Sequence, residues 1–318
     1  MAEKILGVVG FPLKKSLFPA LYLAALKATD IAQDYEYNLF EIEEQSFQQF
    51  FESLKAKNII GLNISASYQA KIASLVEFDE DVSYLKRLKV VDTIVYKDGK
   101  WMGYNTQIPA LLKELKNAEF DPKRKKCMII GAESIAKSVA YALIKLDVDE
   151  IVVYDAQEEK VTAVAASLKA LFPDSRIYPA WEADGLNTQE VELLINTTSL
   201  GSKETDPLPV PEKLLHTGMF IYDFIFSPLE TKLLHKAILG GMQSRNGFGL
   251  LLNQALISFE LFTGKTLTME AFQQALSKAG KPKFGSALGL IIGAVFFILI
   301  LILLIYVLSG GVKMQIAD

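Results

Sequence analysis

The sequence predicts an α/β protein with a two-domain body followed by one transmembrane helix. Short apolar runs alternate with amphipathic segments, which is typical of βαβ units around a mainly parallel sheet. The alternation starts afresh at Lys126, and the body is too long for one typical core, so we expect two domains. From Phe284 to Val312 no residue is charged, and a helix needs about 20 apolar residues to cross a bilayer.

The first domain is predicted to alternate strands with helices and then form a hairpin. We expect strands at Ile5–Val9, Tyr35–Leu39 and Ile59–Ile64, with helices at Ser16–Ala28 and Glu44–Lys57 between them. Val90–Tyr96 and Trp101–Tyr104 are two further apolar runs. Asp98-Gly99 lies between them, and this dipeptide favours the tight turn of a β-hairpin.

The second domain has the doubly wound pattern of Rossmann-type nucleotide-binding domains. We expect strands at Lys126–Ile130, Ile151–Tyr154, Leu193–Asn196 and Phe220–Asp223, and helices at Ser134–Lys145 and Glu158–Leu171. Two helices, near Gly249–Thr263 and at Met269–Ser277, complete the body. The expected division is residues 1–110 for the first α/β domain, 111–245 for the Rossmann-like domain, 246–280 for closing helices that pack back on the first domain, 285–308 for the transmembrane helix and 309–318 for a short tail.

The charges on either side of the uncharged segment predict its orientation. Lysines precede it at Lys278, Lys281 and Lys283, whereas Lys313, opposed by Asp318, follows it. Because positive residues favour the cytoplasmic side, we expect a single-pass protein of the cell (cytoplasmic) membrane with its body in the cytoplasm. Membrane protein subunits are then the expected partners, reached through the C-terminal helix and the body surface.

Three glycines within this segment suggest a contact face. Gly285, Gly289 and Gly293 recur every four residues, so they share one helix face, and small residues at that spacing let membrane helices pack closely. The alternative is that glycine is simply common in membrane helices.

Composition excludes several other classes of function. The single cysteine, Cys127, rules out an intramolecular disulfide, and two histidines, His216 and His235, do not make a metal site. The net charge is −4, and the one dense basic cluster, Lys123-Arg124-Lys125-Lys126, directly precedes an apolar run. A solvated strand entry explains that cluster better than a nucleic-acid site, so no nucleic-acid partner is expected.

Six segments of the body, taken in order, carry a recognisable pattern. They are Gly10-Phe11-Pro12 with Ser16 and Pro19; Gly61-Leu62-Asn63-Ile64-Ser65; Gly103-Tyr104-Asn105-Thr106; Asn196-Thr197-Thr198-Ser199-Leu200-Gly201; Asp223 with Pro228 and Thr231; and Gly247 and Gly249 with Gln254, Phe259 and Glu260. These segments resemble the motifs of the shikimate dehydrogenase family along nearly the whole body. The resemblance implies a shikimate-binding α/β domain, a Rossmann-type domain that holds NADP, and a substrate cleft between them.

The sequence departs from the family at the proton-transfer pair. The resemblance implies a lysine and an aspartate that hold the reacting hydroxyl and move its proton, and Gln69 and Gln107 occupy those two positions. An amide hydrogen-bonds but exchanges no proton near neutral pH, so we expect no catalytic residues here. Lys71, two residues after Gln69, would point to nearly the opposite face of a helix.

The substrate pocket keeps some of the family's polar residues and loses others. The retained positions are Ser16, Asn63, Ser65, Asn105 and Gln254, although Asn and Ser also hold turns at strand ends. Phe18 replaces a family serine, Phe226 replaces a tyrosine, and Asp92 replaces an asparagine. We expect the Asp92 carboxylate to repel an anionic substrate.

The cofactor loop is altered as well. Gly131-Ala132-Glu133-Ser134 stands where the family has Gly-x-Gly-Gly, and Glu133 brings a negative side chain to the expected pyrophosphate position. Asp155-Ala156-Gln157 replaces the family's Asn-Arg-Thr, so the basic clamp for a 2′-phosphate is missing. Gly131, Ser134, Asp155 and Thr198 remain as a vestigial cofactor site. We expect no cofactor, while Asp155 leaves NAD(P) open because it could accept a ribose hydroxyl.

These departures favour a non-catalytic pseudoenzyme that serves as a membrane-anchored accessory or scaffold subunit of a larger membrane complex. Two alternatives stay open. One is a membrane-tethered NAD(P)-dependent oxidoreductase with an altered substrate. The other is a small-molecule-sensing module whose cleft binds a ligand without reacting.

Overall fold

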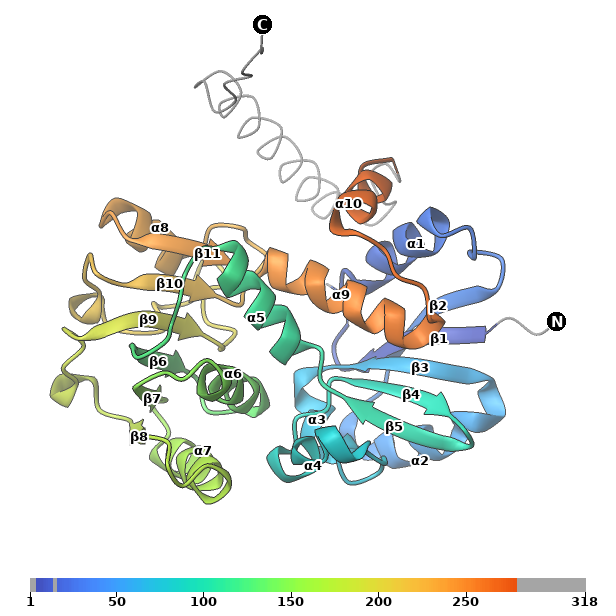
Figure 1. Ribbon diagram of the computed structural model, residues 1–318, viewed down its shortest axis with the longest axis horizontal. Coiled ribbons are helices and arrows are strands. Elements are labelled where there is room, and N and C mark those ends of the chain that lie inside the picture. The colour runs from blue at the N-terminus through green and yellow to red at the C-terminus, as the bar shows by residue number, and fades with distance from the viewer. Residues whose placement is uncertain (1–3, 14–15, 279–318) are drawn as a thin grey trace, which may run out of the picture.

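The computed structural model describes residues 4–13 and 16–278, which form two α/β lobes, each built on its own sheet (Figure 1). The predicted two-domain α/β body is therefore confirmed. The predicted transmembrane helix at 285–308, its glycines and the tail at 309–318 lie outside the described residues. Within the described part of the chain, no helix combines the length and the apolar character that a membrane span requires.

The first lobe contains a five-stranded mixed sheet in the order β2-β1-β3-β4-β5. Its strands are β1 (Lys4–Gly10), β2 (Tyr35–Glu41), β3 (Ile59–Ile64), β4 (Thr93–Lys97) and β5 (Lys100–Tyr104). β1 pairs in parallel with β2 and β3, whereas β4 and β5 form the predicted antiparallel hairpin. Gly99 adopts a φ of 82° in the hairpin turn, a conformation that glycine reaches without a steric penalty.

The helices of the first lobe are α1 (Phe18–Ala28), α2 (Phe47–Ser53), α3 (Gln69–Ile72) and α4 (Tyr84–Leu88). The single helix expected over Glu44–Lys57 is divided: 3-10 turns at Glu44–Ser46 and Lys55–Lys57 flank a short α2. Phe47, Phe50 and Leu54 are buried and still provide one apolar face, so the helical periodicity of the sequence is kept although the helix is not continuous.

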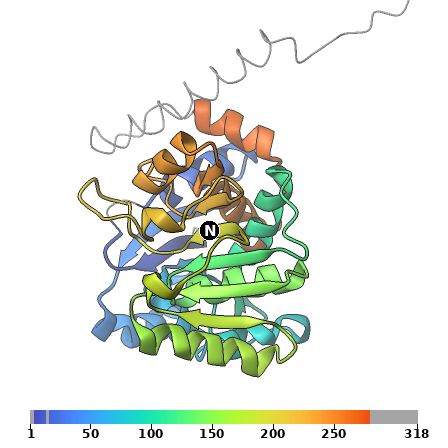
Figure 2. The ribbon, with the colours of Figure 1, turned by 90° about the vertical axis from the view of Figure 1, so that its left-hand side faces the viewer.

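The second lobe contains a six-stranded, fully parallel sheet in the order β11-β10-β9-β6-β7-β8. Its strands are β6 (Lys126–Ile130), β7 (Glu150–Tyr154), β8 (Ile177–Ala180), β9 (Val191–Asn196), β10 (Phe220–Asp223) and β11 (Gln243–Asn246). Helices α6 (Ser134–Lys145) and α7 (Glu158–Leu171) pack into one apolar core, and α8 (Lys232–Leu239) packs into another (Figure 2). The sheet is therefore covered on both faces, as a doubly wound fold requires.

Two helices join the lobes. α5 (Gln107–Asn117) and α9 (Phe248–Thr263) contact each other and run between the two sheets (Figure 1). Leu250 belongs to the core of the second lobe, whereas Phe262 packs in the first. A Cβ on Gly61 of β3 would lie 2.4 Å from the Phe262 ring, so this glycine permits the close approach of α9 to the sheet. α10 (Met269–Lys278) packs on α1 through the fully buried Phe272.

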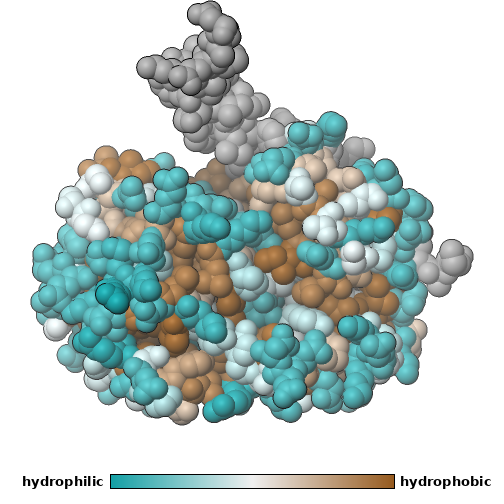
Figure 3. Space-filling view, viewed as in Figure 1, coloured by the Kyte–Doolittle hydropathy of each residue, from teal (hydrophilic) through white to brown (hydrophobic). Residues whose placement is uncertain are grey.

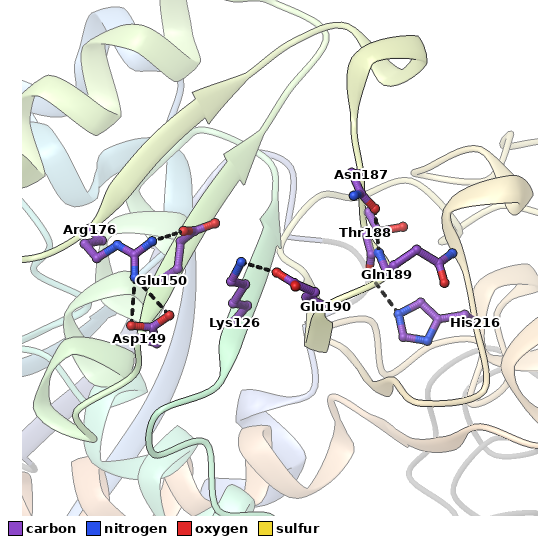
Figure 4. A network of polar contacts seen from close by, with 9 residues as sticks. All are labelled: Lys126, Asp149, Glu150, Arg176, Asn187, Thr188, Gln189, Glu190 and His216. Atoms are coloured by element: carbon purple, nitrogen blue, oxygen red, sulfur yellow. Dashed lines mark hydrogen bonds and ion pairs between the residues drawn. The ribbon is translucent and has the colours of Figure 1, made fainter.

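Charged residues cluster where the strands of the second sheet begin. In Figure 4, Lys126 pairs with Glu190, Arg176 bonds Asp149 and Glu150 at 2.9 Å, and a ring nitrogen of His216 contacts the Thr188 carbonyl at 2.8 Å. Lys126 and Glu150 open β6 and β7, so this network lies at the amino ends of the strands. Ligands of doubly wound sheets bind beyond the carboxyl ends, so the candidate site must be sought at the opposite edge.

Candidate active site

The segments with the candidate residues leave the first sheet at one edge. Asn63 of β3 is level with Thr93 of β4, which is level with Tyr104 of β5. Because β4 is antiparallel to both neighbours, β3 and β5 end on the same side. The chain after β3, carrying Ser65 and Gln69, and the chain after β5, carrying Asn105 and Gln107, therefore emerge together. On the face in Figure 3, apolar residues gather in patches across the middle of both lobes, with hydrophilic residues around the rim.

Gln69 and Gln107 are both buried at this edge. Their side chains are 1% and 8% exposed, and among the described residues neither Oε1 atom has a hydrogen-bond partner. A buried acceptor without a partner costs roughly 1–3 kcal/mol. Lys71 is directed elsewhere: its Nζ pairs with Glu44 at 2.5 Å, and this contact lowers the pKa of the Glu44 carboxyl. Lys71 therefore does not replace the missing lysine.

Asp92 is hydrogen-bonded to other groups of the protein. Its carboxylate accepts hydrogen bonds from the backbone N–H groups of Thr106 and Gln107 at 2.8 and 2.9 Å, and from the Thr93 hydroxyl at 2.8 Å. The side chain is 4% exposed, and burial raises its pKa above the ordinary value while the accepted hydrogen bonds oppose the rise. Asp92 thus holds the start of α5, and with it Gln107, instead of facing a bound anion.

Asn63 is likewise held by neighbouring side chains. Its Oδ1 accepts from the Tyr37 hydroxyl at 2.9 Å, and its Nδ2 lies 3.4 Å from Thr93 Oγ1. Tyr37 stacks on Tyr22 with ring centroids 4.2 Å apart, and the Tyr22 hydroxyl bonds Ser258 of α9. Burial raises the pKa of both tyrosines, so both remain protonated. Nothing in the sequence pattern pointed to Tyr37.

The other predicted pocket residues differ in their contacts and burial. Asn105 Nδ2 donates to the Val90 carbonyl at 2.6 Å and to Ser138 of α6 at 3.0 Å, so Asn105 links the two lobes. Ser65 contacts the Ser67 hydroxyl at 3.2 Å. Ser16 and Gln254 are half-buried.

The carboxyl edge of the second sheet carries the predicted cofactor residues. Gly131 adopts a φ of 103°, and a Cβ there would lie 2.7 Å from the Thr197 hydroxyl, so glycine is required. Asp155 accepts hydrogen bonds from the N–H groups of Ala132 at 3.1 Å and Gln157 at 2.9 Å. Its carboxylate therefore holds the loop next to the strand end.

Glu133 is the N-cap residue of α6, but its side chain makes no capping bond. It instead pairs with Lys160 of α7 at 3.3 Å. The negative charge expected at the pyrophosphate position is thus drawn to α7 and partly neutralised, while Ser134 begins the helix beside it.

A buried polar network holds the turn that contains Thr198. Asn196 Oδ1 accepts from Thr198 Oγ1 at 2.7 Å, and Asn196 Nδ2 donates to Asp223 at 3.0 Å. Asp223 also accepts from Thr231 Oγ1 at 2.7 Å, and burial raises its pKa. This motif has a structural role. Within the described residues, no group of three His, Cys, Asp or Glu side chains could hold a metal ion.

Comparison with known proteins decides the family. The family model of the shikimate dehydrogenase substrate binding domain matches residues 8–94. A shikimate dehydrogenase (NADP(+)) of Methanosphaera stadtmanae is 31% identical over 280 residues, which cover 86% of this chain and 96% of that protein. This chain belongs to the shikimate dehydrogenase family. A second enzyme of the same name, from Carboxydothermus hydrogenoformans, is 30% identical and is covered over 96% of its length.

Solved structures agree with this family assignment. The shikimate dehydrogenase of Aquifex aeolicus superposes with a TM-score of 0.77 at 28% identity, covering 86% of this chain and 97% of that one. A shikimate dehydrogenase solved in complex with NADP+ gives a TM-score of 0.77 at 26% identity, covering 87% and 96%. The predicted family is thus confirmed.

The predicted function as a non-catalytic membrane scaffold is wrong. Relatives about 30% identical over most of the chain are named as NADP-dependent enzymes, and this similarity points to a catalytic protein. The sequence argument counted the changes at Asp92 and Glu133 as losses of function, and it kept Asp155 as a possible acceptor of a ribose hydroxyl. In the structure each of these carboxylates has a hydrogen-bond or ion-pair partner within the protein.

Proposed function

We propose that this protein is an NAD(P)-dependent oxidoreductase that interconverts a hydroxyl and a carbonyl group on a small polar molecule held between its lobes. The observation that carries the proposal is the length of the similarity. The chain covers 96% of relatives named shikimate dehydrogenase (NADP(+)), so it has counterparts of both their substrate half and their cofactor half.

Gln69 and Gln107 are the residues proposed to hold the reacting oxygen. Both amides are buried at one edge of the first sheet, and each has an acceptor atom left without a partner in the described structure. An amide donates to a carbonyl oxygen and accepts from a hydroxyl, so the pair orients the group in either oxidation state. The nicotinamide cofactor, when bound, supplies or takes up the hydride. The proton must then pass through water, since an amide exchanges none near neutral pH.

The apolar replacements in the pocket, Phe18 and Phe226, support a substrate that differs from shikimate. Phe18 and Phe226 pack against the apolar core of the first lobe, at positions where the family resemblance implies hydroxyl groups. Each loses a hydrogen bond to a polyhydroxylated ring and adds apolar surface. The preferred substrate is therefore a less hydroxylated cyclic acid than shikimate.

The test is a turnover assay with the purified full-length protein. Shikimate and less hydroxylated cyclic hydroxy acids are offered with NAD+ or NADP+, and the reduced nicotinamide is followed by its absorbance. We expect measurable turnover that falls in Gln69→Ala and in Gln107→Ala but not in the control Gln48→Ala, an exposed residue bonded to Glu52. Absence of both turnover and dinucleotide binding across this panel would overturn the proposal.

Membrane attachment is proposed as a property of this enzyme. It rests on the uncharged segment from Phe284 to Val312 and on the lysines that precede it. Exposed apolar residues on α8 support it, because Ile238 and Leu239 are 55% and 71% exposed. The protein should fractionate with membranes and be released by detergent but not by high salt, whereas a chain ending at Lys278 should be soluble. Release of the full chain by salt alone would contradict an integral anchor.

If the helix packs on other membrane helices, replacing Gly285, Gly289 and Gly293 by leucine should weaken co-purification of its partners. Unchanged co-purification would place that contact elsewhere on the protein.

A further inference from the structure

The end of α8 presents two adjacent aliphatic side chains to solvent. Ile238 and Leu239 are 55% and 71% exposed, the highest values among the large apolar residues at the surface of the described structure. Leu233 and Leu234 of the same helix are buried in a core of the second lobe, so the exposed pair is not needed to hold α8 on its sheet. Single apolar side chains are common on protein surfaces, and the pair alone does not identify a partner.

The chain leaves the described body close to its uncharged segment. α10 ends at Lys278, and the five residues 279–283 separate it from Phe284, where the uncharged segment begins. An extended chain spans at most about 3.3–3.6 Å per residue, so Lys278 lies within about 22 Å of Phe284. If this segment enters the bilayer, as proposed above, the α10 side of the body must face the membrane.

α8 lies on that same side of the protein. Figures 1 and 2, two views at right angles about the vertical axis, both show α8 and α10 along the upper side of the molecule. α3, which begins at Gln69, lies on the lower side in Figure 1. A body that rests on the membrane through α8 and α10 therefore keeps the candidate active site away from the lipid, on the side where a small polar substrate is dissolved.

The charges on this side suit an anionic lipid surface. α8 contains two lysines and no acidic residue, and one of the two, Lys236, pairs with Glu212 at 2.9 Å. Lys232 donates to a backbone carbonyl, a neutral acceptor, at 2.8 Å and so keeps its full charge. Lys278 is exposed at the end of α10, and two more lysines precede Phe284. Lysines are attracted to the anionic cytoplasmic leaflet, and aliphatic side chains beside them enter its headgroup region.

We propose that the end of α8 is a second membrane contact, in which Ile238 and Leu239 enter the headgroup region of an anionic bilayer. The inference rests on the membrane attachment proposed above and extends it. Two aliphatic side chains bind a membrane only weakly by themselves, so the uncharged segment holds the protein at the bilayer and the α8 pair fixes which side of the body faces it. Apolar groups at such interfacial sites lie about 5–10 Å into the boundary between headgroups and acyl chains.

The test measures the depth of the α8 pair in liposomes that contain the full-length protein. Leu239→Cys carries an environment-sensitive fluorophore, and the native Cys127 does not compete for the label because it is fully buried. Lipids with a nitroxide at a known depth quench the fluorophore. We expect quenching at a depth of about 5–10 Å in liposomes of phosphatidylcholine with phosphatidylserine, and weaker quenching in phosphatidylcholine alone.

Tyr178→Cys is the matched control for the labelled position. Tyr178 is also an exposed apolar residue, at 43%, but it belongs to β8 on the lower side of the molecule (Figure 1), so its label should escape quenching. Ile238→Asp in the protein labelled at position 239 should remove the quenching, because a carboxylate does not enter the apolar region. Its unfolding midpoint should be unchanged, since Ile238 is exposed.

The outcomes separate the α8 contact from the anchor. Equally weak quenching at positions 239 and 178, in a protein that only detergent releases from the liposomes, would overturn the α8 contact and leave the anchor standing. A protein that does not stay with the liposomes would overturn both. A blue-shifted label at position 239 that lipid nitroxides do not quench would place a second copy or another part of this chain on the pair and overturn the proposal. Unchanged quenching in Ile238→Asp would do the same.

Discussion

Replacing Gln69 by leucine should make the protein more stable and less active. The Gln69 side chain is 1% exposed and its Oε1 atom lacks a hydrogen-bond partner in the described structure. An unsatisfied buried polar atom costs roughly 1–3 kcal/mol, and leucine of similar volume removes that cost while keeping the packing. For a chain of this size each 1 kcal/mol shifts the unfolding midpoint by about 2–4 °C. We therefore expect the midpoint to rise by about 2–12 °C.

Activity should change in the opposite direction. A neutral hydrogen bond contributes about 0.5–1.5 kcal/mol, so its loss at the reacting oxygen should lower kcat/KM by about 2- to 12-fold. Calorimetric scans of the wild type and of Gln69→Leu are compared with the turnover assay on the same preparations. Gln48→Leu is the matched control, because Gln48 is exposed and bonds Glu52 at 2.9 Å. A lowered midpoint with unchanged turnover would show that the Gln69 amide is satisfied and structural, and would refute this reasoning.

Three further predictions test the surroundings of the site. Gly131→Ala should lower the unfolding free energy by at least about 2 kcal/mol, because the residue has a φ of 103° and no room for a Cβ. Chemical denaturation measures this change, and an unchanged midpoint would mean that the loop has another conformation. Tyr37→Phe should lower the free energy of unfolding by about 1–3 kcal/mol because it removes the hydroxyl that donates to buried Asn63, whereas Tyr35→Phe should change it little. Equal losses of unfolding free energy in the two variants would contradict the hydrogen bond between Tyr37 and Asn63. Burial raises the pKa of the Cys127 thiol to about 12 from an ordinary 9.0, so between these values the folded state binds more protons and stability falls as pH rises, by about 1.4 kcal/mol per pH unit. Cys127→Val should flatten this alkaline slope, and an identical slope in both proteins would assign it to other groups.

Many, but not all, of the elements whose apolar residues face a core were predicted from the sequence; α8, with Leu233 and Leu234 buried, was not. α6 and α7 occupy the predicted ranges, Ser134–Lys145 and Glu158–Leu171, because each keeps a helical stripe of buried residues. β11 was missed because Gln243–Asn246 has no apolar side chain and lies at the edge of its sheet. α5 (Gln107–Asn117) was not predicted because the boundary between the domains was placed inside it, between residues 110 and 111, whereas a helix joins the lobes there.

The candidate residues could be located from the sequence, but their partners could not. The motifs assigned Asn63 and Asn105 to the substrate pocket and Gln69 to the proton-transfer pair, and in the structure each of them ends or follows a strand of the first sheet. The Tyr37–Asn63 bond links residues 26 positions apart, and the Asn105–Ser138 bond links different lobes. Such contacts depend on how the lobes and strands pack, which no local pattern encodes.

The mistaken inference of lost catalysis has a physical cause. A substituted acid was assumed to keep its full charge at the site, as if no other group had adjusted to it. Asp92 instead receives N–H donors at the start of α5, and Glu133 pairs with Lys160. A carboxylate that accepts several hydrogen bonds presents much less negative potential to a ligand than a free one. Of the changes that suggested a pseudoenzyme, the two amides Gln69 and Gln107 are therefore the ones that bear directly on proton transfer, and losing a positioned acid–base group typically slows such a step by about 10²–10⁴.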